Sequence, residues 1–362
     1  MLDAVACYCL FPDYFHKKVP ALEAIAPSPT PTEAVVTPPP ESWTLSTETA
    51  DEILARAAYP SLRRIDATHS TEYDALLKLR ERMPDCEIRW NYVYDGTTYP
   101  SDAKELKATT LRGLGEAIRC LPELSRVDMR SVDASVEDLD RLDAVRPGLF
   151  FDWVFDFGEA RIRTDIAVFS TLRSGFNHRY TDEELYPLLK YCRKLRALDL
   201  GFNAVTDVSL IGELRELEVL ILSGNPIMDA SPLGNLEKLS FLEMHHCQKV
   251  RSFHFLKKLS AIREINLCYD QACINLDFLG NMPDFSFGMF KFTDVDSDDF
   301  NTWVSRFPGA TIILWGSEDA TDCGWQATPR SHDIRHAFKL WRHITAYRGI
   351  GDADYDMTRC VY

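Results

Sequence analysis

The feature that most constrains this chain is a repeat of about 22 residues, visible from Leu195 onward. The units "LRALDLGFNAVTDVSLIGELRE" and "LEVLILSGNPIMDASPLGNLEK" share one pattern, and five units begin at Leu195, Leu217, Leu239, Ile262 and Phe285. A unit this short cannot bury an apolar face alone, so it must stack on its neighbours. The sequence therefore predicts an elongated repeat array rather than a compact globule.

Each unit has the pattern of one short strand followed by a turn. Leu198 and Leu200 are predicted to point inward and Asp199 to the open face, because successive side chains of a strand point to opposite sides. The turn position after the strand is occupied by Asn203, Asn225 and Cys247. Side chains at this position are expected to form hydrogen bonds with backbone groups of the neighbouring coil. Carboxylates expected to cap the return segment lie at Asp207 and Asp229.

A longer repeat precedes this array. "YPSLRRIDATHSTEYDALLKLRERMPDCEIRWNYVYDG" resembles "LPELSRVDMRSVDASVEDLDRLDAVRPGLFFDWVFDFG", with the pairs Pro60 and Pro122, Pro84 and Pro147, and Trp90 and Trp153. A third copy of the tail, "FPGATIILWGS", contains Pro308 and Trp315. Each long unit is predicted to hold ordinary coils and one extended Trp-bearing excursion, giving about nine coils in the whole chain.

The pattern L-x-x-L-x-L-x-x-N-x-[VI]-x-D-x-x-x-L, specific over 195–284, resembles the 22-residue leucine-rich repeats of the internalin-like bacterial class. The Pro/Trp units and "ATDCGW" resemble leucine-rich-repeat surface proteins of Gram-positive gut bacteria, over about 55 to 330. The resemblance implies a cell-surface or secreted interaction protein without assigned chemistry. We expect an α/β leucine-rich-repeat solenoid, with a curved parallel sheet on the concave face and short helices or loops on the convex face.

Three zones are expected along the chain. Residues 1–50 contain "APSPTPTEAVVTPPPES", whose prolines favour extended, solvated backbone, so this zone is predicted to be a disordered Pro/Thr-rich tether. The solenoid is expected over 51–315, with irregular long repeats over 51–194 and regular repeats over 195–309. Residues 316–362 are predicted to form a C-terminal helical cap and tail, because apolar residues recur with helical spacing at Ile334, Phe338, Leu340, Trp341 and Ile344.

Charge and composition restrict the partners. The formal net charge of −15 at pH 7 repels a phosphate backbone, so nucleic acid is not an expected partner. No stretch reaches the roughly 18 to 20 apolar residues of a spanning helix, and membrane insertion of the folded domain is not expected. A tethered domain favours the cell surface or secretion, with the cytoplasm as the alternative.

The ten cysteines include no CxxC pair. Cys120, Cys192, Cys247 and Cys268 fall at interior positions of the repeat, which predicts buried, reduced thiols. Disulfides between Cys7 and Cys9, and between Cys268 and Cys273, stay open as alternatives.

The repeat register aligns side chains into columns on the concave face. Ten residues of these columns are predicted to contact a partner: Val219, Ile221, Phe241, Glu243, His245, Glu264, Asn266, Phe287, Met289 and Lys291. The apolar members have the composition of a binding hot spot, on a face that needs no apolar residues for the core. Glu243, Glu264 and His245 would suit a cationic or mixed protein surface. The alternative interpretation is that the C-terminal cap or an excursion folds over the cluster.

No catalytic or cofactor-binding motif accompanies this face, and neither an enzyme activity nor a cofactor is expected. His332 and His336 have a spacing that can hold zinc, but no third ligand accompanies them. "DVDSDD" from Asp294 and "DADYD" from Asp352 lack the glycine of a calcium loop, so no metal site is expected.

The sequence therefore predicts a non-enzymatic module that binds another protein on the concave face of the solenoid. Two alternatives stay open. One is a structural spacer or tethered surface scaffold. The other is glycan binding through the Trp-bearing edge, at Trp90, Trp153 and Trp315.

Overall fold

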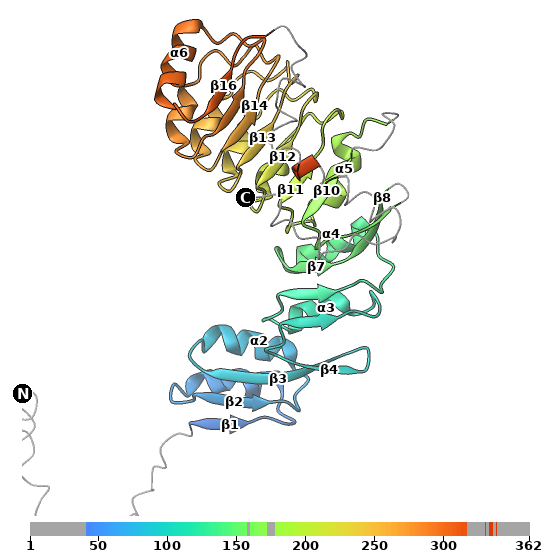
Figure 1. Cartoon of the computed structure of the whole chain (residues 1–362). Coiled ribbons are helices and arrows are strands. Elements are labelled where there is room, and N and C mark those ends of the chain that lie inside the picture. The colour runs from blue at the N-terminus through green and yellow to red at the C-terminus, as the bar shows by residue number, and fades with distance from the viewer. Residues whose placement is uncertain are drawn as a thin grey trace, which may run out of the picture.

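The described part of the chain is an elongated solenoid that contains three sheets, arranged one after another and parallel except for one hairpin strand in the first (Figure 1). The computed structural model describes residues 41–157, 160–171 and 178–316, together with 330, 333–335 and 338. Strands of each sheet lie side by side, and the helices that connect them stack against one another. Apolar residues between these two layers form the core.

The first sheet begins earlier than the sequence predicted. Its strands, in the order β1-β2-β3-β4, are β1 (Ser42–Thr44), β2 (Arg64–Ala67), β3 (Glu87–Tyr94) and β4 (Thr97–Pro100). Its helices are α1 (Ala50–Ala55), η1 (Arg56–Ala58) and α2 (Tyr73–Arg82). Strand β1 pairs in parallel with β2, and Leu45 is fully buried. The expected tether over 1–50 is therefore wrong at its end, because Trp43 and Leu45 supply apolar area that the preceding prolines lack. Residues 1–40 lie outside the described ranges.

The second sheet repeats this plan. It consists of β5 (Glu105–Lys107), β6 (Arg126–Asp128) and β7 (Phe150–Asp152), with helices α3 (Leu114–Cys120) and α4 (Val136–Val145). A hairpin of β8 (Val154–Phe157) and β9 (Ala160–Arg163) follows. Because β3 and β7 pair in parallel with their predecessors, each Trp-bearing excursion also supplies a coil of its own. The prediction of about nine coils is therefore too low.

The predicted excursions are β-hairpins, and they have the same geometry in both copies. The backbone N–H of Trp90 donates to Ser101 Oγ at 3.2 Å, and that of Trp153 donates to Thr164 Oγ1 at 2.9 Å. In the first hairpin, Asp95 and the following glycine both have positive φ, as a two-residue turn of mirror-image type requires. The 62- to 63-residue offset in the sequence thus corresponds to a structural duplication.

The third sheet holds the regular repeats and one strand on either side of them. Its seven strands are β10 (Val168–Ser170), β11 (Ala197–Asp199), β12 (Val219–Ile221), β13 (Phe241–Glu243), β14 (Glu264–Asn266), β15 (Phe287–Met289) and β16 (Thr311–Ile313). Neighbours are parallel throughout. Their return segments carry α5 (Asp182–Leu189), η2 (Ile211–Glu213), η3 (Ser231–Asn235), η4 (His254–Lys258), η5 (Asp277–Asn281) and α6 (Ser297–Arg306).

Buried side chains form a ladder at the turns after β11 to β14, and the first members hold their turns by hydrogen bonds, as predicted. Asn225 donates from Nδ2 to the carbonyls of Leu200 and Leu222, both at 2.8 Å, and its Oδ1 accepts from the backbone of Val205 at 3.0 Å. Asn203 makes equivalent bonds in the preceding coil. Cys247 and then Asp270 occupy the same position in the next coils.

Candidate partner-binding face

The structure confirms the register from which the concave columns were predicted. Val219 is paired with Phe241, Phe241 with Glu264, and Glu264 with Phe287. In the second column, Ile221, Glu243, Asn266 and Met289 follow one another in the same way. The intervening residues, such as Leu220 and Leu242, belong to the core behind the sheet.

Nine of the ten predicted contact residues are buried. They have exposed fractions between 0% and 7%, and they are Val219, Ile221, Phe241, Glu243, His245, Glu264, Asn266, Met289 and Lys291. Phe287 is partly buried. The face is thus assembled as the sequence predicted, but its side chains have little contact with solvent.

Residues from the C-terminal part of the chain contact this face. Arg335 donates from Nη2 to Glu243 Oε2 at 2.8 Å, and Arg330 donates from Nη2 to Ser240 Oγ at 2.6 Å. Ile334 and Phe338 are buried and belong to the same apolar cluster as the concave residues. Two described residues of the predicted cap, Arg330 and Arg335, therefore contact β13 and the residue before it. The remaining positions of the cap prediction, including His332 and His336, lie outside the described residues.

The face buries several carboxylates whose partners come from neighbouring coils. Asp199 accepts from Ser170 Oγ at 2.9 Å and from the backbone N–H of Gly201 at 3.1 Å. Its burial raises the pKa of Asp199 to about 6, against the opposing effect of these hydrogen bonds. Glu243 accepts from Ser223 Oγ at 3.2 Å, and His245 Nε2 lies 3.4 Å from Glu243 Oε1. The face is therefore apolar with fixed anionic points.

One strand of a parallel sheet recurs every 22 to 24 residues from β11 to β16, leucines point inward, and asparagines hold the turns. The fold is a leucine-rich-repeat solenoid. Three solved structures resemble it. An internalin of Listeria monocytogenes is 14% identical with a TM-score of 0.35, and the match covers 76% of this chain and 67% of that one. A leucine-rich-repeat protein of Leptospira interrogans is 11% identical with a TM-score of 0.32, covering 75% and 81%.

The third, TLR13 solved in a complex with ssRNA13, is 14% identical with a TM-score of 0.31, covering 78% of this chain and 37% of that one. No protein-family model and no curated protein matches the sequence. Within the described ranges, no helix combines the length and apolar character needed to cross a bilayer.

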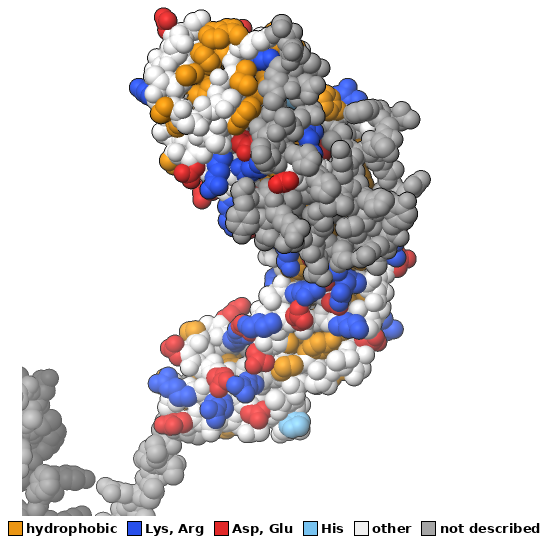
Figure 2. Space-filling model, in the orientation of Figure 1, with side chains coloured by type: hydrophobic (Ala, Val, Ile, Leu, Met, Phe, Trp, Pro, Cys, Tyr) orange, Lys and Arg blue, Asp and Glu red, His pale blue; other side chains and the backbone are white. Residues whose placement is uncertain are grey.

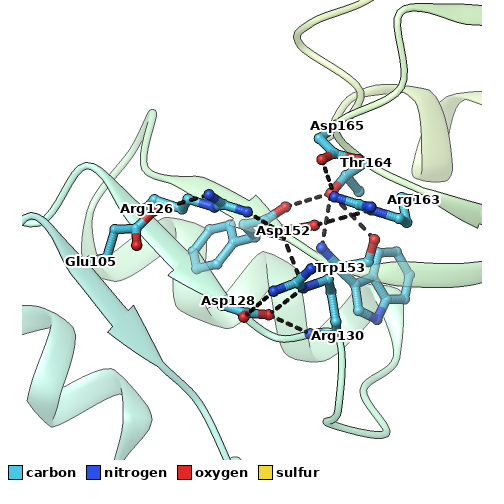
Figure 3. A network of polar contacts seen from close by, with 10 residues as sticks. Glu105, Arg126, Asp128, Arg130, Asp152, Trp153, Arg163, Thr164 and Asp165 are labelled. Carbon is cyan, nitrogen blue, oxygen red and sulfur yellow. Dashed lines mark hydrogen bonds and ion pairs between the residues drawn. The ribbon is translucent and has the colours of Figure 1, made fainter. Parts of the chain in front are cut away.

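The N-terminal coils of the leucine-rich-repeat solenoid present a different surface. Figure 2 shows acidic and basic side chains intermingled over the first two sheets. At the end of the second sheet, Arg126, Arg130 and Arg163 converge on Asp152 (Figure 3). The Asp152 side chain is fully buried, whereas Arg130 is 45% exposed. Arg163 comes from β9, so this network fastens the hairpin to the sheet. The sequence does not predict this network, because the spacing of Asp152 and Arg163 matches no motif.

Other sequence candidates have structural roles in the described ranges. Trp90 and Trp153 are buried, which agrees with packing of the hairpins, and the Trp90 Nε1–H donates to the Cys120 carbonyl at 2.9 Å. Trp315 is 59% exposed and rests on Phe300.

Cys120, Cys192, Cys247 and Cys268 are all buried, and no disulfide joins any of them to another described cysteine, as predicted. No disulfide joins Cys268 and Cys273, so the disulfide alternative for this pair is wrong.

The acidic run from Asp294 also has a structural use. Asp296 caps α6 by accepting from the backbone N–H groups of Asp298 and Asp299 at 2.9 and 2.8 Å. Asp299 accepts from the backbone of Leu276 at 2.7 Å. No group of three or more metal-ligating side chains occurs in the described part of the chain.

Proposed function

We propose that the concave face of strands β11–β15 binds a protein. The observation that carries the proposal is an apolar surface that the core does not need. Val219, Ile221, Phe241 and Met289 lie on the opposite side of the sheet from the leucines that close the solenoid. A spacer needs no such surface, whereas a protein partner that displaces the residues now in contact with this face can bury the same apolar side chains.

The anionic side chains give the proposed interface its specificity. Asp199, Glu243 and Glu264 lie among the apolar residues at fixed positions. A partner that leaves them unpaired would pay a desolvation penalty, so a protein with matching cations is favoured over other apolar surfaces. Glycan stacking gains no comparable support, because Trp90 and Trp153 are buried and the exposed Trp315 stands without them.

The test uses two substitutions in a single coil. The full chain is immobilised, proteins captured from cell extracts are identified, and their direct binding is measured with purified material. Phe287→Ala changes the partly buried phenylalanine of the concave face, and Phe292→Ala changes one that is 48% exposed at the edge. We expect Phe287→Ala to weaken binding about tenfold or more and Phe292→Ala to leave it unchanged. Loss with Phe292→Ala alone would move the site to the edge, and equal binding by all three proteins would refute the proposal.

A further inference from the structure

The residues that cover the concave face have the spacing of one side of a helix. Arg330, Ile334 and Phe338 are four residues apart, and the backbone is helical at each of them. Ile334 and Phe338 are 1% and 2% exposed, whereas Asp333 in the same stretch is exposed. Ile334 and Phe338 therefore pack within the apolar cluster of the solenoid, whereas Asp333 lies at the surface.

The charges of the two surfaces also match. Arg335 pairs at 2.8 Å with Glu243, whose side chain is only 2% exposed. Arg330 is bonded to Ser240, and the nearby Glu264 favours its charged form against the effect of burial, which lowers the Arg330 pKa. A buried carboxylate is costly without a cation, so an occupant of this face must supply positive charge at these points. Arg330 and Arg335 supply it, although they lie 87 and 92 residues beyond Glu243 in the sequence.

These two observations carry an inference that rests on the proposed function. We propose that the partner of the concave face is a basic amphipathic helix, and that residues 330–338 of this chain compete with it for the same surface. The partner helix presents two apolar side chains four residues apart, flanked by arginine or lysine. A covalently attached competitor has a high effective concentration, so the partner binds only to the fraction of molecules in which this stretch is displaced.

The thiol of Cys268 offers a direct readout. It occupies the same concave position in its coil as Ser223 and His245, and it is fully buried. Alkylation of each cysteine in the full-length protein is followed by mass spectrometry, with Cys247 of the inner ladder as the internal reference. The variants are Arg335→Glu alone and combined with Phe338→Ala. Arg251→Glu, an exposed arginine outside the concave columns, is the charge-matched control.

We expect Cys268 to react about tenfold faster in the two Arg335→Glu variants than in the parent protein. Cys268 should react at the parent rate in the Arg251→Glu control, and Cys247 should react at the parent rate in every protein. A labelled peptide of residues 328–340, "TPRSHDIRHAFKL", is then added in trans. It should bind the released variants at least about tenfold more tightly than the parent and restore protection of Cys268. A peptide with glutamate in place of both arginines should do neither.

The outcomes separate the two proposals. Unchanged Cys268 reactivity in both released variants would overturn the competition. If Cys268 is reactive in the variants but the basic peptide neither binds these variants nor protects Cys268, the proposal of a basic helix as the partner is wrong. In that case the proposed protein-binding function stays testable with the released variant as bait, because its concave face is then uncovered.

Discussion

Replacing Asp270 by asparagine should stabilise the protein, and by more as the pH rises. Asp270 occupies the turn position that Asn203 and Asn225 fill in earlier coils, and it is only 1% exposed. Neither of its carboxyl oxygens has a hydrogen-bond partner among the described residues. Burial raises the pKa of Asp270 to about 8, and the opposing effect of the Cys247 backbone N–H is smaller.

The magnitude follows from proton linkage. An unfolded aspartate titrates near 3.9, so between about pH 4 and pH 8 the folded protein holds a proton that the unfolded chain releases. Because the folded pKa is the higher one, stability is fully present below about pH 4 and is lost as the pH rises toward 8. At about 1.4 kcal/mol per pH unit, the carboxyl costs up to about 4 kcal/mol at pH 7. Asparagine does not titrate, and its amide can donate to the Leu267 and Cys268 carbonyls, as Asn203 does to the equivalent carbonyls in its coil.

The assay is hydrogen exchange of peptides from the 262–275 coil, supported by urea unfolding, at pH values from 4.5 to 8. Asp270→Asn should raise the local opening free energy by about 2–4 kcal/mol near pH 8 and by about 1 kcal/mol or less near pH 4.5. Asp284→Asn, at a side chain that is 69% exposed, is the matched control and should change little. If Asp270→Asn raised the opening free energy equally at every pH, or lowered it near pH 8, the Asp270 carboxyl would not be neutral and buried without water as argued.

Three further substitutions test the packing. Trp90→Phe should lower the unfolding free energy by about 2–4 kcal/mol in urea titrations, because the Cys120 carbonyl loses its donor; retention of full stability would contradict that role. Gly224→Ala should cost about 1–2 kcal/mol in the same assay, since φ is +70° and the new Cβ would lie 2.6 Å from the Phe202 ring; an unchanged midpoint would mean that the ring moves aside freely. Asp152→Ala should cost about 3 kcal/mol and speed proteolysis of the β8–β9 hairpin, because three arginines lose their common partner; cleavage at the parent rate would show that the hairpin is held by packing alone.

The regular coils could be predicted because their determinants are local and periodic. Leucines at alternate positions fix which side of the strand is buried, and a one-residue slip would turn all of them to solvent. The columns from Val219 to Phe287 followed from this rule and are paired as predicted. The start of the solenoid was placed too late, because one short strand around Trp43 carries no repeat signal of its own.

The sequence by itself thus determined the solenoid, its strand register and the residues of the concave face, since each depends on side chains a few positions apart. The tertiary structure alone decided what lies on that face. Contacts such as Arg335 with Glu243 and Arg163 with Asp152 join segments whose separation follows no period. They form because a buried carboxylate is stabilised by a cation that is close in space. The repeat pattern does not specify how far apart in the sequence these two residues lie.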